Sequence, residues 1–211
     1  MKQILLFGGS GFLGQSLLEQ LASQDVKVYA VTRKLTDDLL QKKTKSIEWI
    51  EADLYQPSEW SYLLEDIDVV IDLVGIVRED LEKGLTYQHV IFDAAKTIAD
   101  AMEDSKGKTF IYVSTNLNTD HTPEKYRQTK KETEDYLLNK AFSTVILRPG
   151  FMYGSSRPEK VALAEKILAN LEQDSPAWAG RPILVDDVAK TIGTIILDGP
   201  ERQIYELEHM H

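Results

Sequence analysis

The chain contains no cysteine among its 211 residues. Disulfides, thiolate nucleophiles and cysteine-based metal sites are therefore excluded together. Long apolar runs are also missing, because no segment approaches the roughly 20 apolar residues that a membrane-spanning helix requires. The apolar run that precedes Gly8 and Gly9 is too short for the core of a signal peptide. We therefore expect a cytoplasmic protein with no integral membrane segment.

Positive charge is scarce, since 24 lysines and arginines stand against 34 acidic residues and leave a net charge of −10. Nucleic-acid binding requires clustered lysine and arginine to neutralise phosphates, so we expect no nucleic-acid partner. Histidines are few as well, and none has the spacing of a helical metal site. They are His89, His121, His209 and His211. We expect no bound metal.

Internal repeats, low-complexity tracts and Gly/Ser linkers are absent, and 211 residues suit a single domain. Proline and glycine become frequent only after Arg148. We therefore predict one domain over residues 1–211. Its first two-thirds would form the scaffold, and residues 150–211 would contribute the substrate-side segment.

Six apolar runs, each followed by a helical pattern, predict alternating strands and helices. The predicted strands are Gln3–Phe7, Val26–Val31, Ser46–Ile50, Asp68–Leu73, Thr109–Val113 and Thr144–Leu147. The predicted helices are Phe12–Gln24, Leu35–Gln41, Ser58–Glu65, Tyr87–Asp104, Pro123–Lys140, Glu159–Leu171 and Asp186–Leu197. Runs that are apolar throughout indicate strands covered on both faces. We predict an α/β fold with a doubly wound parallel Rossmann sheet, helices on both faces, and a minimal C-terminal segment that covers the substrate.

A glycine-rich loop lies between the first predicted strand and the first predicted helix. Its residues are Gly8, Gly9, Ser10, Gly11, Phe12, Leu13 and Gly14. Glycines at this spacing permit a tight turn, let the backbone approach a pyrophosphate, and allow close packing of helix on strand. An ordinary tight turn is the alternative, but the strand before and the helix after favour an NAD(P)-binding loop with phosphates at the helix N-terminus.

Residues after the second and third predicted strands bear on the form of the cofactor. Arg33 follows the second strand, where an acidic residue would bind the ribose of NAD, so we favour NADP(H) over NAD(H). A solvated surface arginine is the alternative. Asp53 and Leu54 are placed to meet the adenine, although an aspartate there is as often a loop cap.

A tyrosine and a lysine lie four residues apart near the start of a predicted helix, at Tyr126 and Lys130. This spacing puts the phenol and the ammonium on one helix face. A nearby ammonium favours the phenolate, which would make proton exchange with a carbonyl or an alcohol feasible. Ser114, after the fifth strand, would polarise the same oxygen. The alternative is an exposed amphipathic face.

With the glycine loop, Ser114, Tyr126 and Lys130 in this order, the chain resembles the short-chain dehydrogenase/reductase superfamily, in its extended or atypical branches. The resemblance continues through Val69–Gly75, Tyr112–Ser114, Leu147–Gly150, Tyr153–Gly154 and Val185–Ala189. These blocks look most like the group related to the nucleotide-binding accessory subunit of respiratory complex I, which includes relatives associated with quinone metabolism.

The resemblance implies a role for each matching residue. Tyr126 would be the acid/base, Lys130 would hold the nicotinamide ribose and tune Tyr126, and Ser114 would orient the substrate oxygen. The cofactor would be lined by Leu73, Val74 and Gly75, and the nicotinamide would be covered by Pro149. Two departures from the family are Asp72, where asparagine or alanine is usual, and the short segment after Gly154.

We therefore expect an NADPH-dependent oxidoreductase that acts on a small carbonyl, a quinone or a flavin. One alternative is a nucleotide-sugar epimerase or dehydratase, although the short segment after Gly154 argues against so large a substrate. The other is a non-catalytic NADPH-binding sensor or assembly factor, since a fold alone does not fix a function. The sequence is compatible with a homo-oligomer.

Overall fold

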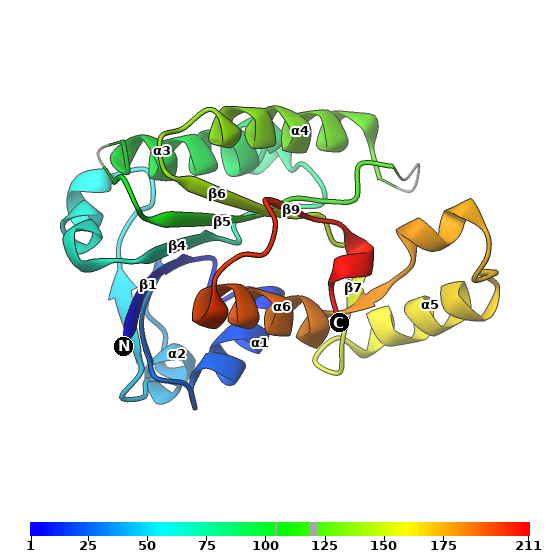
Figure 1. The fold of residues 1–211 in the computed structure, drawn as a ribbon, viewed down its shortest axis with the longest axis horizontal. Helices are drawn as coiled ribbons and strands as arrows, with labels where there is room; N and C mark the ends of the chain where they lie inside the picture. Colours follow the sequence, from blue (N-terminus) through cyan, green and yellow to red (C-terminus); the bar gives the residue numbers. More distant parts are fainter. Residues whose placement is uncertain (104, 119–121) are drawn as a thin grey trace.

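A central sheet of seven parallel strands runs through the computed structural model, which describes residues 1–103, 105–118 and 122–211 (Figure 1). The strand order is β3-β2-β1-β4-β5-β6-β9. The strands are β1 (Lys2–Phe7), β2 (Val26–Thr32), β3 (Ile47–Glu51), β4 (Val69–Asp72), β5 (Thr109–Val113), β6 (Ser143–Leu147) and β9 (Ile204–Tyr205). The predicted Rossmann-type α/β fold is confirmed.

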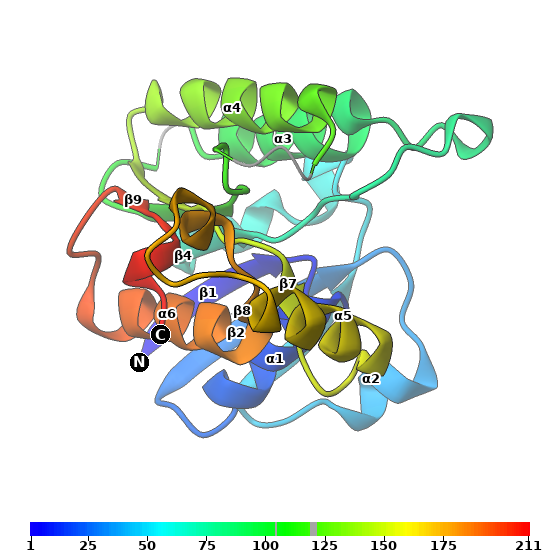
Figure 2. The same ribbon diagram turned by 90° about the vertical axis from the view of Figure 1, so that its right-hand side faces the viewer.

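Helices cover both faces of the sheet (Figure 1). One face carries α1 (Phe12–Leu21), α2 (Asp37–Gln41) and α6 (Val185–Asp198), and the other carries α3 (Ala94–Ala101) and α4 (Glu124–Leu138). Outside these layers, α5 (Pro158–Ala169) packs against a two-stranded sheet of β7 (Met152–Tyr153) and β8 (Ile183–Leu184) (Figure 2). Short turns are the 3-10 helices η1 (Pro57–Glu59), η2 (Ser61–Asp66), η3 (Leu81–Lys83), η5 (Pro176–Gly180) and η6 (Leu207–His209), and the π-helical η4 (Gln88–Asp93).

The strands are apolar throughout because successive residues enter different cores. On β1, Ile4 and Leu6 pack into the core beneath α1 and α6, whereas Leu5 and Phe7 pack into the core beneath α3 and α4. All four are almost fully buried. Burial of one such side chain contributes roughly 1.5–3 kcal/mol, so β1 anchors both layers.

Two predicted helices differ from the structure, and one strand of the main sheet was not predicted. The predicted helix over Ser58–Glu65 is a pair of 3-10 turns, η1 and η2, whose first turn begins at Pro57. The predicted helix over Tyr87–Asp104 begins as the π-helical η4 and continues as α3, and its last predicted residue, Asp104, lies outside the described residues. The sequence did not predict β9, because two residues are too few to show a periodicity.

The segment after residue 150 divides into two parts. Residues 151–184 form β7, α5, η5 and β8, whereas α6 returns to the main layers and packs closely on α1. Ser16 on α1 donates a hydrogen bond of 2.6 Å to Asp186 at the start of α6. The part of this segment that lies outside the main layers is therefore residues 151–184, and a substrate-side role for residues 150–211 stays a prediction. No helix within the described ranges is long and apolar enough to cross a membrane.

Candidate functional site: a dinucleotide cradle at the ends of the strands

The glycine loop after β1 makes two close approaches that only glycine permits. Gly8 has a φ of +83°, and a Cβ there would lie 2.9 Å from the carbonyl carbon of Leu73. A Cβ on Gly14 would lie 2.3 Å from the carbonyl oxygen of Gly8. The turn is closed by the Gly11 amide, which donates to the Gly8 oxygen over 3.0 Å. The loop therefore holds α1 tightly against β1 and β4.

The N-terminus of α1 is available to an anion. Gly11 is its N-cap, and no side-chain hydrogen bond caps this end of the helix within the described residues. The first turn also carries no acidic residue. Free amide groups and the positive end of the helix dipole therefore point toward the place where a pyrophosphate would bind.

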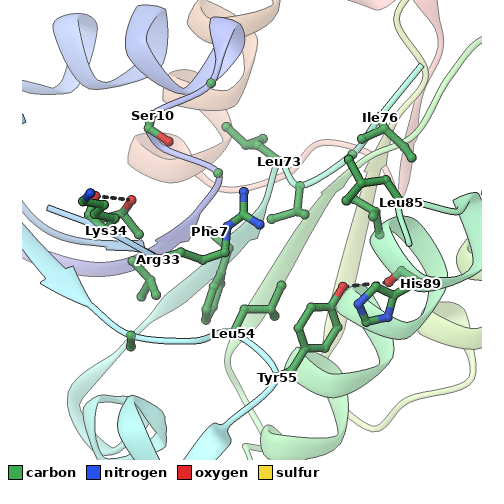
Figure 3. Close-up of a pocket in the computed structure, with 18 residues that line it drawn as sticks. Phe7, Ser10, Arg33, Lys34, Leu54, Tyr55, Leu73, Ile76, Leu85 and His89 are labelled. Carbon is green, nitrogen blue, oxygen red and sulfur yellow. Dashed lines mark hydrogen bonds between the residues drawn. The ribbon is translucent and has the colours of Figure 1, made fainter. Parts of the chain in front are cut away.

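A cavity of about 680 Å³ opens beside this loop at the carboxyl ends of β1, β2, β3 and β4 (Figure 3). Its volume suits a cofactor or a drug-sized ligand. Among the predicted cofactor residues, those that line it are Gly8, Ser10, Gly11, Arg33, Leu54, Leu73, Val74 and Gly75. Gly9, Phe12, Leu13, Gly14, Asp53 and Pro149 are not part of the described lining. The structure thus brings the four loops that follow β1, β2, β3 and β4 together around one space.

Arg33 extends its guanidinium over Phe7 toward the middle of the cavity (Figure 3). The side chain is exposed, and no ion pair links it to an acidic residue of the described chain. Glu51, which lies nearby on β3, instead accepts a hydrogen bond of 2.6 Å from the amide of Leu35. The positive charge of Arg33 is therefore free to meet an anionic group on a ligand.

Asp53 acts as a loop cap, which was the alternative to an adenine contact. Its carboxylate accepts a hydrogen bond of 3.0 Å from the amide of Tyr55. Tyr55 and His89 were not predicted as cavity residues; their rings stack at 4.4 Å and form the cavity wall opposite Arg33 (Figure 3). The Tyr55 hydroxyl donates to the His89 carbonyl oxygen over 2.8 Å. These two residues are 34 apart in the chain, so no local pattern could have identified them.

Tyr126 is buried on α4, with its ring edge-to-face against Tyr87 at 5.3 Å between centroids. Burial raises the pKa of Tyr126 to about 12, although a hydrogen bond with the Thr115 side chain acts to lower it. The sequence predicted the opposite direction, from a nearby ammonium. The prediction was wrong in this respect, because burial is the largest influence on the phenol and Lys130 is not among the groups that act on its pKa.

Lys130 is also buried, and its ammonium points at the end of the sheet. It donates a hydrogen bond of 2.8 Å to the Val113 carbonyl oxygen and lies 4.6 Å from the centroid of the Tyr112 ring. A Cβ on Gly75 would lie 3.8 Å from Nζ, which places the ammonium behind the cavity wall. Because Tyr126 and Lys130 are both buried, the alternative of an exposed amphipathic face is excluded.

Thr115, which the sequence did not single out, hydrogen-bonds Tyr126, whereas Ser114 does not. The Ser114 hydroxyl is buried and has no hydrogen-bond partner among the described residues. Thr115, rather than Ser114, makes the side-chain hydrogen bond with Tyr126. The missed signal was that consecutive residues at a strand end point to opposite sides. The substrate-orienting role of Ser114 stays a prediction.

Pro149 lies where three segments meet after β6. Its carbonyl oxygen accepts a hydrogen bond of 2.9 Å from the amide of Asn116, and the Asn116 side chain donates to the carbonyl of Ala179 in η5. At the next residue, a Cβ on Gly150 would lie 2.3 Å from the Arg181 oxygen. The segment after β6, including η5, therefore packs directly onto the loop that follows β5.

No cluster of three or more potential metal ligands occurs in the described ranges. His121 lies outside those ranges. The expectation of no metal stays a prediction.

The parallel sheet, the glycine cradle and the uncapped α1 N-terminus define a dinucleotide-binding protein of Rossmann type. A family model described as NAD(P)H-binding matches residues 8–198. The chain therefore belongs to this NAD(P)H-binding family, and its predicted place in the extended short-chain dehydrogenase/reductase superfamily is confirmed. The family supports a nicotinamide cofactor, and the cradle fits one because its closest approaches leave no room for a Cβ.

The chain is similar to proteins whose names indicate different activities. FMP52, mitochondrial, of Candida albicans is 23% identical over 205 residues, which cover 94% of this chain and 88% of that protein. Ceramide reductase of Caulobacter vibrioides is 25% identical over 160 residues, which cover 76% of this chain and 49% of the reductase. A solved structure of UDP-glucose 4-epimerase has a TM-score of 0.71 at 20% identity, with 97% of this chain and 76% of that chain covered.

Proposed function

We propose that this protein is an NADPH-dependent oxidoreductase that reduces a small carbonyl, a quinone or a flavin, with Tyr126 as the proton donor. The observation that carries the proposal is the arrangement around the cavity at the strand ends. The glycine cradle and Arg33 line the cavity, and Lys130 lies immediately behind its wall at Gly75. Tyr126 lies one helical turn from Lys130 on α4.

The preference for NADPH is supported by Arg33. A guanidinium binds a phosphate through paired, charge-assisted hydrogen bonds, whereas the 2′-hydroxyl of NADH offers no charge. The end of β2 carries Arg33 and Lys34 in the cavity lining, and neither is an acidic residue that would select the hydroxyl.

The reduction direction is supported by the buried state of Tyr126. When bound, the nicotinamide would supply a hydride to the substrate. The pKa of Tyr126 is raised to about 12 by burial, so its phenol keeps its proton at neutral pH and can donate it to the developing alkoxide. The Thr115 hydroxyl, which hydrogen-bonds Tyr126, would hold the phenol in place. Donation by a neutral phenol suits reduction better than oxidation.

A second function, NADPH binding without turnover, is favoured by one observation. Tyr126 is almost completely buried and does not belong to the described lining of the cavity. A substrate would reach the phenol only if the segment over the strand ends moved. The cytoplasm stays the proposed compartment, although the Candida albicans relative is named a mitochondrial protein.

Turnover assays separate these two functions. The protein is mixed with NADPH and a panel of quinones, flavins and aldehydes, and the loss of NADPH absorbance is followed. We expect turnover with at least one class, and a rate roughly 100-fold lower for Tyr126→Phe because the proton donor is gone. Tyr62→Phe, at an exposed tyrosine on η2, is the matched control and should keep the rate.

Two results would count against the oxidoreductase proposal. Tight NADPH binding without turnover across the panel would support the non-catalytic function. Equal rates for the wild type and Tyr126→Phe would exclude Tyr126 as the proton donor.

A further inference from the structure

Asp72 ends β4 as a fully buried carboxylate. One oxygen, Oδ1, accepts a hydrogen bond of 2.8 Å from the amide of Val74. The other, Oδ2, is buried and has no hydrogen-bond partner among the described residues. A buried carboxylate with a free oxygen is unfavourable unless another charge compensates it.

Lys130 supplies a compensating charge from α4. Its ammonium bonds to the carbonyl of Val113 and faces the ring of Tyr112, which is the residue paired with Asp72 in the β4–β5 register. Burial lowers the pKa of Lys130 to about 8, and Asp72 is the strongest influence that opposes this shift. Burial likewise raises the pKa of Asp72 to about 6, against the Val74 hydrogen bond and the charge of Lys130.

The other carboxylate near Lys130, that of Glu134, already forms an ion pair with Arg148. Glu134, one turn further along α4, also acts to raise the pKa of Lys130. However, both oxygens of Glu134 accept hydrogen bonds from the guanidinium of Arg148. The remaining titratable neighbours, Tyr112 and Tyr126, are phenols whose pKa values burial raises, so both stay neutral. Among the described residues, Asp72 is therefore the carboxylate that acts on Lys130 and forms no ion pair with another cation.

We propose that Asp72 is a positioning residue, whose buried carboxylate keeps Lys130 protonated at the ends of β4 and β5, behind Gly75. Asp72 and Lys130 do not form a direct ion pair, so the effect acts through charge. The same carboxylate holds the Val74 amide, and it therefore links the cavity-lining turn Leu73–Gly75 to the state of the lysine. The catalytic meaning of this link rests on the proposed function, but the link itself does not.

The test uses Asp72→Asn, which keeps an oxygen for the Val74 amide and removes the charge. Asp68→Asn is the matched control, because Asp68 is an exposed carboxylate that bonds to the Gln3 amide just before β4. Lysine side chains are labelled with carbon-13, and the Lys130 signal, assigned with Lys130→Met, is titrated by NMR without cofactor. We expect the midpoint of Lys130 to fall by about one pH unit or more in Asp72→Asn and to stay unchanged in Asp68→Asn.

An unchanged Lys130 midpoint in folded Asp72→Asn would overturn the proposal. If Asp72→Asn does not fold, thermal unfolding of Lys130→Met and of the double variant decides the question. If the charges of Asp72 and Lys130 stabilise each other, Lys130→Met should have a lower melting temperature than the wild type. Adding Asp72→Asn should then restore part of the lost melting temperature. A further loss in the double variant would contradict the proposal. Because no cofactor is used, a failure here is distinct from a failure to bind or oxidise NADPH.

Discussion

Arg33 is exposed to solvent and Tyr126 is buried, and each environment suits the proposed role of the residue. The guanidinium of Arg33 extends into an open cavity and keeps its charge available to a ligand (Figure 3). The phenol of Tyr126 is buried against the ring of Tyr87, and burial raises its pKa to about 12. One residue can therefore bind an anion, while the other can hold a proton for delivery.

Replacing Arg33 with alanine should weaken NADPH binding by roughly 10- to 100-fold, because a charge-assisted phosphate contact contributes about 1.5–3 kcal/mol. NADH binding should change little, since NADH has no 2′-phosphate. Fluorescence titration of both cofactors measures the two dissociation constants. Arg78→Ala removes an exposed arginine outside the described cavity lining and should leave both unchanged. An equal loss of affinity for both cofactors would place Arg33 away from the 2′ position.

Lys130 should give the stability of the protein a recognisable pH dependence. Its pKa is lowered by burial from 10.5 to about 8, so between these values the unfolded chain binds a proton that the folded chain has released. The free energy of unfolding should therefore rise with pH through this window, by up to roughly 3 kcal/mol. Urea unfolding of the wild type and Lys130→Met at several pH values measures the difference. A parallel pH profile for the two proteins would contradict the assignment.

At the scale of elements, the unit of β1, glycine loop and α1 could be predicted from the sequence because its determinants are local. The contacts of Gly14 are with Gly8 and Gly9, within the loop itself, and only the approach of Gly8 to Leu73 after β4 joins distant parts of the chain. Other parts of the site depend on residues distant in the chain, such as the Tyr55–His89 stack. Thr115 was missed for a different reason. Successive side chains at a strand end point to opposite faces of the sheet, and the sequence does not show which of these faces α4 covers. Packing between elements, rather than composition, determines these features.

Gly14→Ala tests the contact between α1 and the loop. The added Cβ would collide with the Gly8 oxygen, so α1 must shift away from β1. We expect a loss of about 1–3 kcal/mol in the free energy of unfolding and a loss of NADPH binding. Gly193→Ala, within α6, is the control because its Cβ would meet no atom within 4 Å. The Gly193→Ala variant should be more stable by up to about 1 kcal/mol, since alanine favours helices. A Gly14→Ala variant that is as stable as the wild type and still binds NADPH would contradict the claim that the close contact at Gly14 forms the cofactor site.

At the scale of the molecule, Arg148 connects layers that are remote in sequence. From the end of β6 its guanidinium bonds to Glu134 on α4 and, over 2.7 Å, to Glu206 before η6. The Arg148 amide also donates to the Tyr205 oxygen, which extends the pairing with β9. The sequence predicted the strands that make up most of the sheet, but not this closing edge, because a two-residue strand is defined only by its partner.

Calorimetric titration of the purified wild-type protein with NADPH tests the central claim most directly. The cavity between the glycine cradle, Arg33 and the Tyr55–His89 wall should bind NADPH saturably at one site per chain, and more tightly than NADH. The same titration of Gly14→Ala should show no binding under these conditions. If the folded wild-type protein bound neither NADPH nor NADH saturably, the cavity would not be a dinucleotide site and the proposed function would be wrong.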